Sequence, residues 1–113
     1  MDEIDKEIEA REKRDAKALR EKREREIARG RHAKELLDDW LLIEVFDQIQ
    51  TECMRILREF PIEKPEMAVQ ARQKLDASDT VRALLKTIVT SGTLDSMQMA
   101  AEDAAVVEDD DDE

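Results

Sequence analysis

The sequence predicts an all-α protein, in which a long antiparallel helical hairpin follows a charged single helix and precedes a disordered acidic tail. Three observations favour this fold class. Apolar residues recur at spacings of three and four, and no run alternates apolar with polar residues as a strand would. The 113 residues include only two glycines and two prolines, so few turns are expected. Large apolar residues are concentrated in the middle of the chain, between two ends rich in charge.

Residues 1–29 are predicted to form the charged N-terminal helix. They contain ten acidic and ten basic residues. Acid-then-base pairs four positions apart, such as Glu7 with Arg11, each stabilise a helix by roughly 0.3–0.5 kcal/mol. Large aliphatic residues are too widely spaced here to make the seam of a coiled coil. We therefore expect a solvated single helix that orders against a partner, followed by a hinge at residues 30–32.

Residues 33–92 are predicted to form the hairpin, with helices at 33–60 and 65–91. A continuous apolar stripe runs along the first helix. Pro61 ends this helix because proline has no backbone N–H to donate. The short connection that follows makes the two helices antiparallel neighbours.

Gly92 is expected to end the second helix as a left-handed cap. Residues 93–113 should then hold a short weak helix and a disordered acidic tail. From residue 94 onwards the chain has nine acidic and no basic residues, within a net charge of −11 for the whole sequence. Blocks of like charge repel one another and are typical of disorder.

The hairpin has more apolar surface than its two helices can cover. Residues 40–43 are consecutive and large, so they lie on every side of their helix, whereas a partner helix covers one side. Two helices alone rarely bury enough surface to offset their ordering entropy. We expect a homo-oligomer, with the N-terminal helix or a different protein as alternative coverings. The predicted interface comprises Leu37, Trp40, Leu41, Leu42, Ile43, Phe46, Ile49, Leu85 and Ile88.

The basic tract between Arg11 and Arg31 is the candidate for contact with nucleic acid. It contains ten Lys or Arg residues against five acids, and such cations bind phosphates. However, no aromatic residue interleaves to stack on bases, so a solvated, salt-paired helix face is the preferred interpretation. The predicted phosphate contacts would be Arg14, Lys17, Arg20 and Arg23.

The acidic end is a candidate docking segment. Two valines directly precede the acidic block, so a few apolar contacts would anchor a peptide that charge steers to a basic surface. The alternatives are a solubilising end and a mimic of nucleic-acid charge. The predicted docking residues are Val106, Val107, Asp109, Asp110, Asp111 and Asp112.

No catalytic, cofactor-binding or metal site is predicted. His32 has no serine or cysteine nucleophile placed to pair with it. The carboxylates at 38, 39 and 44 lack the Glu-x-x-His motif of metal-binding helix bundles. Arg82 falls on the apolar face of the second hairpin helix, where Asp47 or Asp39 would supply a carboxylate partner. No run approaches the roughly 20 apolar residues that span a bilayer, so no membrane partner is expected.

A pattern of apolar spacing and a few polar residues runs through 33–92. Its members are Ala33, Leu36, Leu37, Leu42, Val45, Phe46, Asp47, Ile49, Pro61, Asp79, Arg82, Leu85 and Gly92. This pattern resembles a family of small all-helical proteins encoded among the virion-assembly genes of tailed bacteriophages and prophages. The acidic C-terminus departs from the basic helix-turn-helix that ends known scaffolding proteins.

The resemblance implies a non-enzymatic structural or assembly protein, either capsid-associated or scaffold-like. Its partners would be further copies of itself and other virion proteins such as coat or portal, and its location the host-cell cytoplasm or the virion. Two alternatives stay open. One is a nucleic-acid-associated accessory protein of genome packaging, and the other is a small acidic regulator directed at the host.

Overall fold

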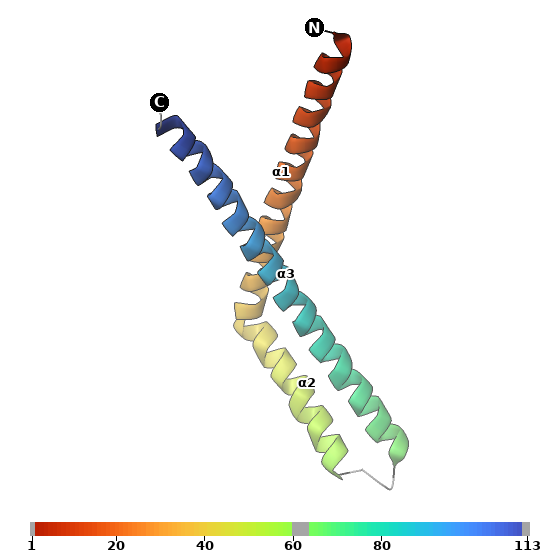
Figure 1. Ribbon diagram of the computed structural model, residues 1–113. Coiled ribbons are helices and arrows are strands. Elements are labelled where there is room, and N and C mark those ends of the chain that lie inside the picture. The colour runs from red at the N-terminus through yellow and green to blue at the C-terminus, as the bar shows by residue number, and fades with distance from the viewer. Residues whose placement is uncertain (1, 60–63, 112–113) are drawn as a thin grey trace. The chain divides into compact units, whose positions relative to one another are not determined.

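The computed structural model describes residues 2–59 and 64–111, with side chains described as far as residue 105. In this part of the chain every regular element is a helix, which confirms the all-α class (Figure 1). The elements are α1 (Glu3–Asp38), α2 (Trp40–Glu59) and α3 (Pro65–Asp111).

The helices are divided between two compact units. Unit 1 consists of Met1–Arg31 and Thr90–Glu113, and unit 2 of His32–Val89. Both α1 and α3 therefore contribute residues to each unit, whereas α2 belongs to unit 2 alone. These unit boundaries do not test the domain division predicted from the sequence, which stays a prediction.

Unit 2 contains the hairpin of α2 and the first part of α3, which run in opposite directions (Figure 1). Its buried residues are Ala33, Phe46, Cys53 and Ala71. Three of these four are small, so the helices meet where little side chain separates their backbones. Phe46 is the one large side chain among them. Most large apolar residues of the hairpin therefore lie beside the centre of the packing rather than in it.

The first arm of the hairpin is interrupted at Asp39, although its apolar spacing predicted a continuous helix. The side-chain Oδ1 of Asp39 accepts hydrogen bonds from the backbone N–H groups of Leu41 (2.9 Å) and Leu42 (3.0 Å). This is the geometry of an N-cap, which satisfies N–H groups that have no partner in the first turn of a helix. Asp39 thus ends α1 and begins α2.

At residues 30–32, where a hinge is expected, α1 is helical. The boundary between the two units falls between Arg31 and His32, and the hinge stays a prediction. The cap expected at Gly92 is wrong, since α3 continues past it to Asp111 and no glycine has a positive φ. The short helix predicted after Gly92 is the continuation of α3. The predicted disordered tail falls on residues whose side chains, and for 112–113 the backbone also, lie outside the described part.

Unit 1 pairs α1 with the C-terminal part of α3, again in opposite directions (Figure 1). The chain contains two glycines, Gly30 and Gly92, and they face each other here. A Cβ added at Gly92 would lie 2.9 Å from the Cα of Gly30 and 2.9 Å from the carbonyl oxygen of Glu26. The two backbones are therefore nearly in contact. Glycine at these positions is explained by this close approach rather than by a turn.

Candidate interaction surface

The predicted interface residues of unit 2 fall into two groups. Trp40, Leu41 and Ile43 are 73%, 54% and 46% exposed, so they remain available to a partner. The others pack within the unit. Phe46 is buried, and the half-buried members are Leu37, Leu42, Ile49, Leu85 and Ile88. The sequence pattern could not separate these groups, because a consecutive apolar run does not show which side faces the second helix.

Beside the exposed residues lies a hollow of about 260 Å³. It is formed by the end of α1, the first turns of α2 and one face of α3, all within unit 2. Apolar side chains make up most of its wall, and charged groups complete it. The lining residues are Leu37, Leu42, Ile43, Phe46, Asp47, Arg82 and Lys86.

The charged side of the hollow is built around Arg82. Its guanidinium carbon lies 4.8 Å from the centroid of the Phe46 ring, within the range of a cation–π interaction. Asp47, one of the two carboxylates expected to pair with Arg82, does line the same hollow. Lys86 was not among the predicted residues. The sequence does hold a signal for Lys86 as a lining residue, because it follows Arg82 by four positions and so shares its helix face.

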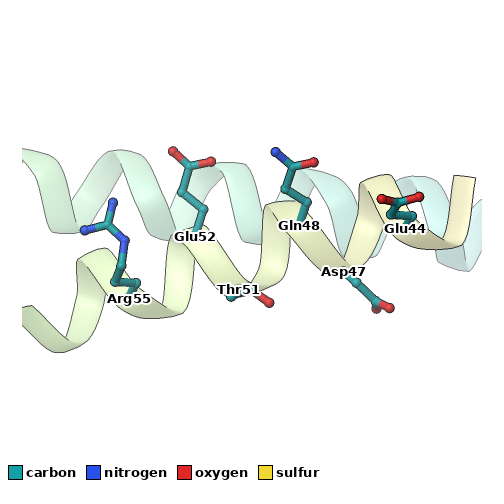
Figure 2. Close-up of a pocket in the computed structure, with 6 residues that line it drawn as sticks. All are labelled: Glu44, Asp47, Gln48, Thr51, Glu52 and Arg55. Atoms are coloured by element: carbon teal, nitrogen blue, oxygen red, sulfur yellow. The ribbon is translucent and has the colours of Figure 1, made fainter. Parts of the chain in front are cut away.

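A second, larger depression of about 570 Å³ lies along α2 alone. All six lining residues come from this helix, and their side chains spread in different directions without meeting at a common point (Figure 2). They are Glu44, Asp47, Gln48, Thr51, Glu52 and Arg55. A helix face of this kind is a polar, solvated surface, and it does not assemble the converging groups that catalysis requires.

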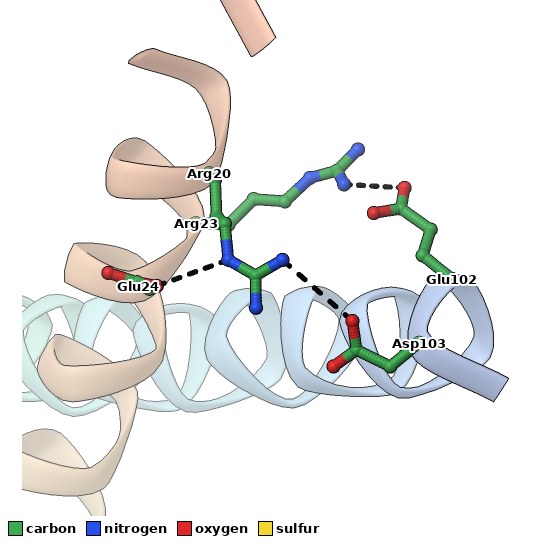
Figure 3. A network of polar contacts seen from close by, with 5 residues as sticks. All are labelled: Arg20, Arg23, Glu24, Glu102 and Asp103. Carbon is green, nitrogen blue, oxygen red and sulfur yellow. Dashed lines mark hydrogen bonds and ion pairs between the residues drawn. The ribbon is translucent and has the colours of Figure 1, made fainter. Parts of the chain in front are cut away.

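Unit 1 also contains ionic contacts between α1 and α3 (Figure 3). Arg23 donates from Nη1 to Oε1 of Glu102 at 2.6 Å, and its side chain is only 16% exposed. Arg20 lies 3.8 Å from Asp103 and 3.5 Å from Glu24. Exposed pairs of this type contribute at most about 1 kcal/mol each. Electrostatic contacts therefore supplement the close backbone approach at the two glycines.

These contacts bear on the predicted phosphate-binding residues. Arg20 and Arg23 already have carboxylate neighbours from α3. Arg14 donates from its Nε to the carbonyl oxygen of Ala10, one turn earlier. Lys17 is exposed on α1. The structure shows the salt-paired face for two of the four residues, and their role in binding phosphate stays a prediction.

The residues considered for catalysis or metal binding are His32, Asp38, Asp39 and Glu44. His32 is exposed, with its Nδ1 3.8 Å from a carboxylate oxygen of Glu35 on the same helix. The described side chains contain no group of three His, Cys, Asp or Glu residues arranged to hold a metal ion. The docking residues predicted in the tail, Val106 to Asp112, lie outside the described side chains, so their role stays a prediction.

The fold and this surface define an all-helical protein with large apolar side chains exposed, a combination typical of partner binding or oligomerisation. In residues 2–59 and 64–111, no helix combines the length and the apolar character that crossing a bilayer requires. Comparison with protein-family models, curated proteins and solved structures finds no match for the chain.

Proposed function

We propose that this chain is a non-enzymatic structural or assembly protein that works by self-association through unit 2. The observation that carries this proposal is the exposure of Trp40, Leu41 and Ile43 around one end of the hairpin. Fully burying such a side chain contributes about 1.5–3 kcal/mol. The part of this energy that the hairpin leaves unused is available to an interface. A second copy supplies the same apolar surface, as in the closed two-fold dimers that most oligomers form.

The finer role we propose is that of a bacteriophage virion or virion-assembly component, capsid-associated or scaffold-like. It is supported by the sequence resemblance of residues 33–92. In that setting the helical unit would oligomerise, while the charged ends would dock on coat or portal proteins. In the sequence, residues 1–29 carry both acidic and basic residues, whereas residues 94–113 carry acidic residues and no basic ones, so the two ends differ in the partners they would favour.

Self-association is tested by size-exclusion chromatography with light scattering on the full chain, over a range of concentrations. We expect an oligomer, and we expect the double substitution Leu41→Ser with Ile43→Ser to shift it towards the monomer. The matched control is Val69→Ser, because Val69 is similarly exposed on α3 in unit 2, away from this cluster in the sequence. A wild-type chain that stays monomeric at every concentration would contradict the proposal.

Binding to DNA is measured in parallel, because it is the test of the packaging alternative. Binding that weakens steeply with salt, and that is lost on replacing Arg14 and Lys17, would favour that alternative. The pairing of Arg20 and Arg23 with carboxylates already reduces the charge that α1 could offer to phosphates.

A further inference from the structure

We infer that Trp40 of one copy inserts into the hollow beside Arg82 of a second copy, and that the exchange is reciprocal. This inference rests on the proposed self-association and names the contact that holds it. Trp40 is the single tryptophan of the chain, and it has the largest exposed fraction among the large hydrophobic residues whose side chains are described. The hollow is a mostly apolar depression of the same unit. Unit 2 thus contains both an exposed indole ring and a hollow that could receive one.

Trp40 lies beside the face of α2 that lines the hollow. Ile43 and Asp47 line the hollow, and they follow Trp40 at intervals of three and then four residues. Residues with these spacings share one face of a helix. Because donor and receptor are neighbours on one surface, a two-fold axis beside them brings each Trp40 to the hollow of the other copy. That is the condition for a self-complementary interface.

The chemistry of the hollow suits an indole ring. Leu37, Leu42 and Phe46 provide apolar contact, while Arg82 and Lys86 provide cations. Tryptophan is the best aromatic partner of a cation, and Arg82 already lies over one ring, that of Phe46. The volume of about 260 Å³ is below the range of roughly 300–1,000 Å³ that is usual for small-molecule pockets. It is of a size to receive one side chain.

The charges around Trp40 favour a second copy over another occupant. Asp38, Asp39 and Glu44 surround Trp40 in the sequence, and all three are exposed. The hollow presents two cations, Arg82 and Lys86, against one carboxylate, that of Asp47. The exchange would therefore place acidic groups of one copy near basic groups of the other, twice in each dimer. Opposite charges that meet in this way steer association and fix the register of an interface.

Because the chain has one tryptophan, its fluorescence reports on the surroundings of Trp40 alone. In the full chain we expect the emission of Trp40 to shift to shorter wavelength, and its quenching by acrylamide to fall, as protein concentration rises. Both changes should follow the growth in mass measured by light scattering. Trp40→Ala should weaken association about tenfold or more, as for a central aromatic residue of an interface. Trp40→Phe should retain part of it.

The controls separate this contact from folding and from self-association in general. Val69→Ala removes an exposed apolar side chain elsewhere in unit 2 and should leave association unchanged. Lys86→Gln removes one cation of the hollow and should weaken association while helix content, measured by circular dichroism, stays the same. Since Trp40 is exposed, its replacement should also leave helix content unchanged.

The outcomes distinguish the exchange of Trp40 from self-association in general. An oligomer in which Trp40 stays fully quenchable, or one that persists unchanged in Trp40→Ala, overturns the exchange and leaves self-association standing. A wild-type chain that is monomeric throughout overturns both. A Trp40 that becomes protected only when a different protein is added also overturns the exchange, because the occupant is then not a second copy.

Discussion

Replacing Gly92 with alanine tests the close contact between α1 and α3 in unit 1. The new Cβ would lie 2.9 Å from the Cα of Gly30 and 2.9 Å from the carbonyl oxygen of Glu26. Both atoms belong to the backbone, so no side chain can rotate away. Carbon atoms in comfortable contact are about 3.5–4.0 Å apart. The two helices must therefore separate by roughly 0.6–1.1 Å, or the contact must be lost.

Two effects of opposite sign decide the magnitude. Alanine in the interior of a helix is more favourable than glycine by about 1 kcal/mol. Forcing an extra methyl group into a packed contact costs about 1–3 kcal/mol. We therefore expect a net destabilisation of the α1–α3 contact of about 1 kcal/mol, although α3 itself becomes a better helix.

Amide hydrogen exchange measures this effect locally, because it reports the opening of individual segments. In Gly92→Ala, the amides of residues 23–31 should exchange about five times faster than in the wild type, since 1 kcal/mol corresponds to a factor of about five. Exchange in α2, which belongs to unit 2, should not change. The matched control is Ser96→Ala, at an exposed position of the same helix, where no loss is expected.

The direction of the change in exchange rate shows whether the steric contact or the helix propensity prevails. If Gly92→Ala slows exchange in residues 23–31, the ordinary helix-propensity gain has prevailed, and the backbones do not approach as closely as described. Equal rates in Gly92→Ala and Ser96→Ala would refute the reasoning in the same way.

Three further outcomes are expected. A double-mutant cycle of Arg23→Gln and Glu102→Gln, followed by thermal unfolding, should give a coupling of about 0.5–1 kcal/mol that falls with salt; a coupling insensitive to salt would contradict it. Asp39→Ala should lower the free energy of unfolding by about 1 kcal/mol, whereas Asp39→Asn should preserve the cap. Phe46→Ala should cost about 3 kcal/mol or more and speed the labelling of the free, buried Cys53 by a thiol reagent; an unchanged labelling rate would contradict it.

The helical class could be predicted from the sequence because it depends on local spacing alone. The end of α2 and the start of α3 were recognisable for the same reason, since Pro61 and Pro65 act on their immediate neighbours. The N-cap at Asp39 was within reach of the same reasoning. An aspartate directly before a large apolar run is a helix-start signal. However, the apolar spacing continues across Asp39, and this predicted one helix instead of two.

The roles of the glycines could not be derived from local pattern. Gly30 and Gly92 each stand where a hinge or a cap is the usual interpretation. Their real environment depends on a contact between residues 62 positions apart in the sequence. The same holds for the candidate surface. Trp40 and Phe46 are both large apolar residues of one helix, and only the position of α3 decides that one is exposed and the other buried.

The small residues at the centre of unit 2 also have a calorimetric consequence. Unfolding raises the heat capacity in proportion to the apolar area newly exposed, and globular proteins average about 12–15 cal/mol/K per residue. Ala33, Cys53 and Ala71 bring little such area, and Trp40, Leu41 and Ile43 are exposed before unfolding begins. A single copy should therefore unfold with an unusually small heat-capacity change. Much of the temperature dependence expected of a folded protein would be acquired only when copies associate.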